Sequence, residues 1–286
     1  MGHAAVSFGY PHSGVAFVTG KTFITAIAVL SGGLGSGCVS TDLVRGAERE
    51  LDRAFRIERP TVFYEPILAK VRGTTGVTPV PPDARQHYLG VIANMEILGS
   101  EGKLELKRAG MLGNALAMKL LAQWRIGRVD AARESLRELR TAGQEPPDQR
   151  VRALVAAFGG IVRIEDAITA NQGGQPFETV LDIIVGPDGA WRALGAARME
   201  AARAGPTPPE VLETRLAAFK VLKSAHERVP PASPLSDALE MSWKRARAEA
   251  QIELAEFASL PSPTPVAHAA KAQQWQTLCG LDPLRR

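Results

Sequence analysis

The stretch LEMSWKRARAEAQIELAEF, residues 239–257, decides the fold class. Its apolar side chains recur at every third or fourth position over about five turns, which is the period of an α-helix and not of a strand. The positions that share one side are Leu239, Trp243, Ala246, Ala250, Leu254 and Phe257. Most other positions carry Ala, Arg, Glu or Gln, which favour helices. The stretch therefore predicts a long amphipathic helix.

The same spacing recurs elsewhere along the chain. Two further apolar stripes are Leu43, Ala47, Leu51 and Phe55, and then Leu212, Leu216 and Phe219. Most of the 20 prolines, which end helices, lie in five clusters at 79–82, 146–147, 206–209, 230–234 and 261–265. The only short β-branched run outside the N-terminal segment is Leu181–Val185, and we interpret it as the end of a helix because one strand cannot form a sheet. We predict an all-α chain of antiparallel helical hairpins, stacked as an irregular solenoid or bundle.

Composition and charge narrow the functional classes. A hydrophobic share of 45% over 286 residues excludes a mostly disordered chain. The formal net charge is only +4, with basic and acidic residues interleaved, which argues against a nucleic-acid partner. Two cysteines exclude a disulfide-rich scaffold, and no two of the five histidines have metal-ligand spacing. We therefore predict no metal, no cofactor and no nucleic acid.

One block resembles a known repeat family. Gly127, Val129, Ala132 and Leu136 match the turn and second helix of a tetratricopeptide repeat, with the first helix expected over residues 114–126. The resemblance implies that the turn glycine lets the two helices pack closely and that the alanine lies where they touch. A weaker match follows at 164–167, close to the family's period, so that hairpins are expected near 108–171. The alternative is a generic helical hairpin.

The N-terminal segment is typical of an exported protein. Lys21 precedes a short apolar run at 22–34, which is the layout of a secretory signal peptide and is too short to span a membrane. The next residues, LGSGC at 34–38, resemble the lipobox of bacterial lipoproteins, although the leucine lies four residues before Cys38 and not three. The resemblance implies cleavage before Cys38, lipidation of its thiol and, with Val39 and not Asp next, the outer membrane facing the periplasm. The alternative is an N-terminal helix or strand with an inert thiol.

These features divide the chain into three parts. Residues 1–37 are expected to be removed, and translation is expected to start downstream of Met1 because residues 1–20 make the basic region unusually long. Residues 38–260 form the helical domain, and 261–286 a proline-rich linker and tail. A P-loop at residues 20–22 is rejected, because five residues separate Gly14 from Gly20 and the motif needs four.

The chemistry-bearing residues do not form a recognisable catalytic set. His87, His226 and His268 neighbour no motif. The acidic pairs Glu165–Asp166 and Glu249–Glu253 lie among basic residues at helical spacing, so solvated ion pairs explain them better than acid–base catalysis. We also expect Cys279 to be a buried thiol, and the alternative is an intermolecular disulfide.

The favoured function is a lipid-anchored, non-enzymatic scaffold that binds other envelope proteins through its helical repeats. The alternative is an all-α envelope hydrolase or carbohydrate-acting enzyme. Among the four tryptophans, Trp191 and Trp275 are predicted protein-binding residues, whereas Trp124 and Trp243 are expected in the core. Trp275 follows the proline-rich linker and could itself dock onto a partner.

Overall fold

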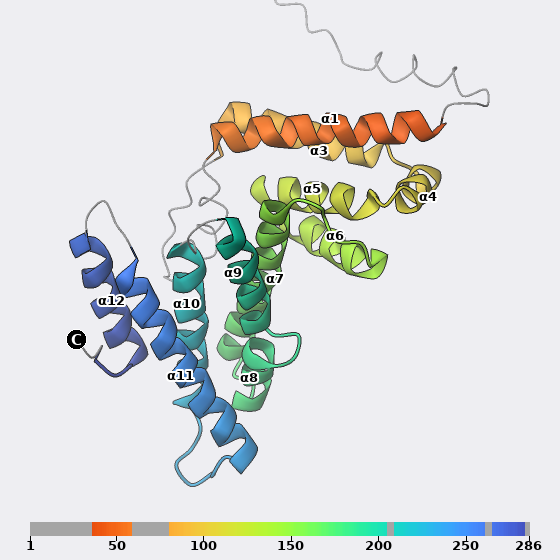
Figure 1. Cartoon of the computed structure of the whole chain (residues 1–286). Coiled ribbons are helices and arrows are strands. Elements are labelled where there is room, and N and C mark those ends of the chain that lie inside the picture. The colour runs from red at the N-terminus through yellow and green to blue at the C-terminus, as the bar shows by residue number, and fades with distance from the viewer. Residues whose placement is uncertain (1–35, 59–79, 205–208, 261–264, 284–286) are drawn as a thin grey trace, which may run out of the picture. The chain divides into compact units, whose positions relative to one another are not determined.

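The computed structural model of the protein describes residues 36–58, 80–204, 209–260 and 265–283 (Figure 1). These residues form helices joined by turns and contain no strand, which confirms the all-α prediction. The helices are α1 (Ser36–Ile57), α3 (Pro82–Glu96), α4 (Ser100–Arg108), α5 (Leu112–Arg125), α6 (Val129–Ala142), α7 (Gln149–Gln172), α8 (Phe177–Val185), α9 (Ala190–Ala204), α10 (Pro209–His226), α11 (Asp237–Ser259) and α12 (Pro265–Cys279). The predicted signal peptide, up to residue 35, lies outside the described residues.

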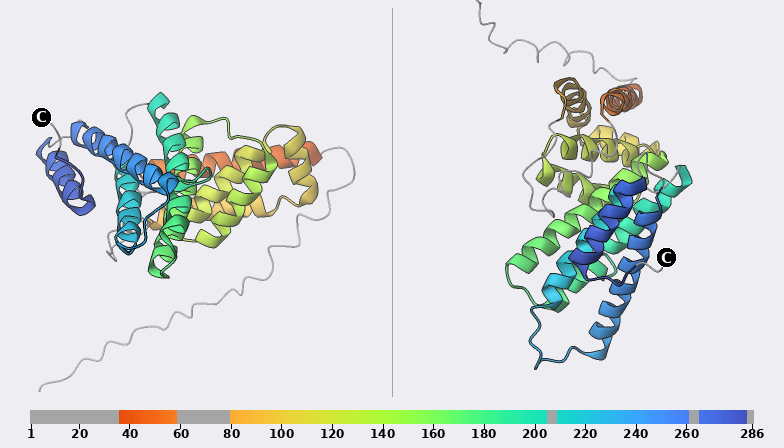
Figure 2. Two further views of the ribbon diagram at one scale, coloured as in Figure 1. Left: turned by 90° about the horizontal axis from the view of Figure 1, so that it is seen from below. Right: turned by 90° about the vertical axis from the view of Figure 1, so that its left-hand side faces the viewer.

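A first hydrophobic core joins α1, α3, α4, α5, α6 and the first half of α7, together with Ala197 of α9 and Val211 of α10. Its large, fully buried side chains include Tyr88, Met118, Leu121 and Phe158. Helices α1 and α3 lie side by side, as both Figure 1 and Figure 2 show, and the Nδ1 atom of His87 is 2.6 Å from Glu50 Oε2 between them. The predicted stripe on α1 is confirmed: Ala47, Leu51 and Phe55 are buried.

A second core joins the last half of α7 to α8–α12. Helix α11 packs against both α10 and α12 (Figure 2). Its predicted stripe is confirmed, with Ala246, Ala250, Leu254 and Phe257 buried and Leu239 and Trp243 partly buried. The segment predicted as a C-terminal tail instead forms α12, whose Ala272, Trp275 and Cys279 belong to this core.

Glycine, aspartate and proline residues mark the ends of several helices. Helix α6 ends at Gly143, which has a φ of 66° that other residues rarely adopt. Helix α7 begins after Asp148, whose carboxylate accepts a hydrogen bond of 2.9 Å from the backbone N–H of Val151. The predicted proline joints at 146–147 and 230–234 separate α6 from α7 and α10 from α11. Leu181–Val185 forms the end of α8, as predicted, and a Gly-Pro turn follows.

Helices α7 and α9 pack closely along one another and run antiparallel. Arg152, near the start of α7, donates a hydrogen bond to Glu200 of α9. Gly160, further along α7, packs against Leu194, which lies earlier in α9. A Cβ atom on Gly160 would lie 2.6 Å from Leu194 Cγ, so the missing side chain is what allows this approach.

Candidate functional site

The predicted hairpin is present as α5 and α6, which pack against each other. Ala132 is fully buried and Leu136 is 7% exposed, as expected for the contact between two helices. Gly127 has a φ of 84°, and a Cβ atom there would meet no atom within 4 Å. The reason for this glycine is therefore the backbone conformation of the turn, and not close helix packing.

A buried hydrogen bond also joins the two helices of this hairpin. Gln123 Oε1 accepts it from the Ser135 hydroxyl at a distance of 2.8 Å. Val129, the second predicted repeat residue, is partly buried at the start of α6. The weaker repeat match at 164–167 lies in the middle of α7, so the helix–turn–helix implied there is wrong.

A groove of about 740 Å³ lies between α6, α7 and α9, together with the loops that follow α6 and α8. Its apolar lining includes Leu136, Leu139, Val155, Ala156, Gly159 and Ala193. Its charged lining is Arg140, Arg152, Arg163 and Arg192, with Glu145, Asp188 and Glu200. The groove thus has an apolar floor, and most of its charged lining residues are arginines. Such a lining is suited to an amphipathic ligand.

Two of the four arginines are already bound within the protein. Arg152 donates from Nε to Glu200 Oε2 at 3.0 Å, and from Nη1 to the carbonyl oxygens of Pro146 and Pro147 at 2.9 and 2.8 Å. Arg192 donates one hydrogen bond of 3.0 Å to the carbonyl of Pro187. Their role is at least partly to fix the loops that border the groove.

The other two arginines are available to a ligand. Within the described part of the chain, Arg140 and Arg163 have no hydrogen-bonding or ion-pair partner. Arg140 comes from α6, and its Nη2 lies 3.5 Å from the Cβ position of Gly159 on α7. Arg163 follows Gly159 by one turn of the same helix. The two arginines therefore line the same groove from different helices.

Sequence reasoning missed this groove. The signal on α7 was the series Arg152, Ala156, Gly159 and Arg163, whose spacing places them on one helix face. Nothing in the sequence indicated which of these arginines had a partner, because Glu200 lies 48 positions beyond Arg152. Arg140 could not be placed either, since it lies on another helix.

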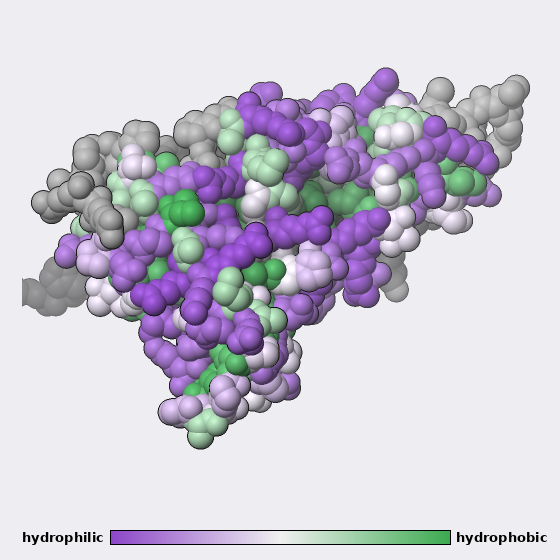
Figure 3. Space-filling view, turned by 60° about the horizontal axis from the view of Figure 1, so that its bottom comes forward, coloured by the Kyte–Doolittle hydropathy of each residue, from purple (hydrophilic) through white to green (hydrophobic). Residues whose placement is uncertain are grey.

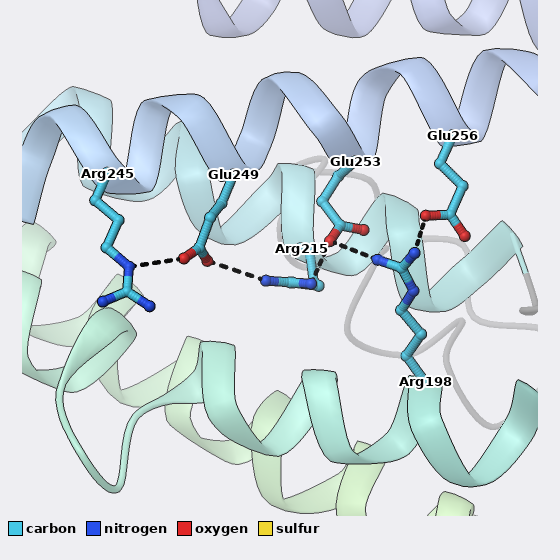
Figure 4. A network of polar contacts seen from close by, with 6 residues as sticks. All are labelled: Arg198, Arg215, Arg245, Glu249, Glu253 and Glu256. Atoms are coloured by element: carbon cyan, nitrogen blue, oxygen red, sulfur yellow. Dashed lines mark hydrogen bonds and ion pairs between the residues drawn. The ribbon is translucent and has the colours of Figure 1, made fainter.

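A second charged cluster joins α9, α10 and α11 (Figure 4). Glu253 accepts hydrogen bonds from Arg198, at 3.1 Å, and from Arg215, and Arg198 also binds Glu256. Glu249 bridges Arg215, at 3.4 Å, and Arg245, at 3.0 Å. The chain of contacts links three helices across one interface.

Much of this cluster is buried, which corrects the prediction of a solvated pair at Glu249 and Glu253. The Glu253 side chain is only 3% exposed and that of Arg215 8%. Burial raises the pKa of Glu253 and lowers that of Arg215, while the charge of each partner opposes the shift. The Arg215 guanidinium also lies 4.7 Å from the ring centre of Trp191. The other predicted pair, Glu165 and Asp166, is partly buried and binds Arg133 of α6.

The tryptophans predicted to bind proteins are core residues. Trp191 is 6% exposed and Trp275 4%, so neither is available as a surface anchor, and this prediction is wrong. Trp275 also does not lie on a free docking segment, because it packs in the second core. Trp124 is buried against Phe158 as expected. Trp243 is partly buried and stacks on His226, with ring centres 4.4 Å apart.

The remaining candidates are structural. His226 is partly buried in this aromatic stack. Cys279 is 1% exposed, which confirms the predicted buried thiol, and burial raises its pKa to about 11. Cys38 lies in the first turn of α1. Nowhere in the described ranges do three or more His, Cys, Asp or Glu side chains form a group that could hold a metal ion.

Comparisons with known proteins add no family. No protein-family model, curated protein or solved structure gives a significant match to this chain.

Among the described helices, none combines the length and apolar character needed to span a membrane. The face drawn in Figure 3 is mostly hydrophilic, with hydrophobic residues in separate patches.

Proposed function

We propose that the protein is a non-enzymatic scaffold of the bacterial cell envelope that binds segments of other proteins in the groove between α6, α7 and α9. The groove is the single observation that carries the binding role. It has an apolar floor, and two of its arginines have no partner among the described residues. A stack of helices that leaves such a surface open is suited to hold a partner segment.

The dimensions of the groove favour a short peptide segment. Its lining on α7 runs from Arg152 to Arg163, which corresponds to about 16 Å of helix. An extended chain covers that length with about five residues. The groove volume also falls in the range that encloses a ligand of this size.

The proposed location rests on the N-terminal sequence. The apolar run at 22–34 and the small residues before Cys38 support export, cleavage and lipid attachment at that thiol. Mass spectrometry of the N-terminal peptide from the native membrane fraction tests this part. A diacylated peptide that starts at Cys38 supports it, and an unmodified peptide that starts upstream of Lys21 refutes it.

A site-specific photocrosslinker tests the binding role in the native envelope. Ala196 is exposed and lines the groove, whereas Ala248 is exposed on α11 outside it. With benzoylphenylalanine at position 196, we expect discrete crosslinked species that contain another protein. The matched variant at position 248 should give none of these species. Identical patterns at both positions, or none at either, would contradict a binding role for this groove.

A further inference from the structure

We infer that the groove binds a protein segment with one or two carboxylates at its centre, and that Arg140 and Arg163 bind those carboxylates. This inference rests on the proposed function and specifies its ligand. It follows from the distribution of paired and unpaired charges along the groove.

The unpaired positive charge lies near the middle and toward one end of the floor. Arg152, at the opposite end of the α7 lining, already binds Glu200 and two backbone carbonyls. Arg140 reaches over Gly159, and Arg163 lies one turn further along α7. A guanidinium with all its donors available binds a carboxylate through two parallel hydrogen bonds, so these two side chains are the natural anion receptors.

Gly159 marks the point of the groove lining where Arg140 packs onto α7. It is buried in the groove lining and has no side chain to fill the floor. The nearest atoms to its Cβ position include Arg140 Nη2 at 3.5 Å and Leu136 Cδ2 at 3.9 Å. The cationic Arg140 and the apolar Leu136 therefore meet at this point of the groove.

Acidic residues at the two ends of the groove limit the position of the ligand's carboxylates. Glu145 follows α6 on the side of Arg152, and Asp188 precedes α9 on the side of Arg163. Both are exposed, and neither has a partner among the described residues. A uniformly acidic segment would meet repulsion at both ends. The complementary pattern is therefore acidic in the middle, apolar beside it and neutral or basic at the ends.

Fluorescence anisotropy with the purified full-length chain tests this pattern. The probes are fluorescein-labelled octapeptides built from Leu and Ala. The Glu-centred peptide has two Glu in the middle and Lys at the ends, and the Lys-centred peptide has Lys in the middle and Glu at the ends. A third peptide carries Gln at the centre. We expect the Glu-centred peptide to bind at least tenfold more tightly than the other two, and more weakly as salt rises.

Matched variants identify the residues responsible. R140Q/R163Q should reduce binding of the Glu-centred peptide at least tenfold. R85Q/R108Q is the control, because both of these arginines are exposed and lie outside the groove. R140E/R163E should reverse the preference and bind the Lys-centred peptide, a gain that misfolding cannot produce.

The other possible outcomes contradict the acidic ligand, the scaffold function or the protein nature of the ligand. Equal binding of the three peptides, or binding unaffected by R140Q/R163Q, overturns the acidic ligand, while crosslinking at position 196 would still support the scaffold. If no peptide binds and position 196 crosslinks to nothing, both proposals fall. A single-stranded oligonucleotide that binds more tightly than the peptides, with the same dependence on Arg140 and Arg163, would overturn the protein ligand.

Discussion

Arg125 holds Glu58 through two hydrogen bonds of 2.7 Å, from Nε to Oε2 and from Nη2 to Oε1, and both side chains are 2% exposed. Glu58 directly follows α1, and Arg125 is the last residue of α5. Tyr88 of α3 donates a third hydrogen bond of 2.7 Å to Glu58, and burial raises the pKa of its hydroxyl. One carboxylate therefore ties three helices of the first core together.

Replacing Glu58 with Ala should strongly destabilise the protein. Arg125 would stay buried after losing both hydrogen bonds to Glu58, and removing one partner of a buried ion pair costs about 3–5 kcal/mol. Urea unfolding measures this loss. The control is Asp42→Ala, which breaks an exposed pair with Arg45 and should cost about 0.5 kcal/mol or less. A comparable loss in the two variants would contradict the structural role of Glu58.

The cluster around Glu253 provides a second comparison. Glu253→Ala leaves Arg215 buried with Glu249 as its remaining carboxylate, so we expect a loss of about 3 kcal/mol or more. Glu256 also binds Arg198, but its side chain is 25% exposed, and Glu256→Ala should cost about 1 kcal/mol or less. Thermal unfolding of both variants would reveal the order. The reverse order would show that Glu253 is not the centre of the cluster.

Replacing each of two helix glycines with alanine distinguishes the effect of close helix packing from the effect of helix propensity. Gly160→Ala places a methyl group against Leu194 and should destabilise the protein by about 1–3 kcal/mol. Gly195 lies inside α9, and no atom lies within 4 Å of its Cβ position. Gly195→Ala should therefore stabilise the protein by up to about 1 kcal/mol. If Gly160→Ala were also stabilising in urea unfolding, α7 and α9 would not pack as closely as described.

Cys279 predicts a specific dependence of stability on pH. Its folded pKa of about 11 exceeds the ordinary value of 9.0, so the folded state favours the protonated thiol. This contribution to stability is complete below about pH 9 and is lost as the pH rises through 11, by roughly 3 kcal/mol in total. The difference in unfolding free energy between the protein and Cys279→Ala should therefore shrink over this range.

Alkylation offers an independent measurement on Cys279. In a Cys38→Ser background, iodoacetamide at about pH 8 should leave the folded protein unmodified and react once urea unfolds it. The buried thiol donates to the Leu216 carbonyl at 3.7 Å, which also limits its access to reagent. Rapid alkylation without urea would contradict the burial of Cys279.

Local features were predictable from sequence where the physical cause is local. The period of Ala246, Ala250, Leu254 and Phe257 indicated a helix and its buried face, because side-chain direction along a helix depends only on spacing. The turn at Gly127 was predictable for the same reason, since a positive φ favours glycine whatever surrounds it. The proline clusters likewise indicated where helices end.

The burial of polar and aromatic side chains required the tertiary structure. The sequence indicated solvated charges for Glu253 and surface anchors for Trp191 and Trp275, but all three are buried. Their burial depends on helices that lie far away in sequence: Arg215 precedes Glu253 by 38 positions, and the Arg125–Glu58 pair spans 67.

The sequence by itself thus determined that the chain is helical, where several helices end and which faces are apolar, because these properties arise from neighbouring residues. Only the tertiary structure decided which charges are paired and which remain free. Arg152 and Arg163 lie on one face of α7, yet the first binds Glu200 and the second has no partner among the described residues. The groove and its available cations exist because α6, α7 and α9 meet, and spacing along one helix does not determine how separate helices pack.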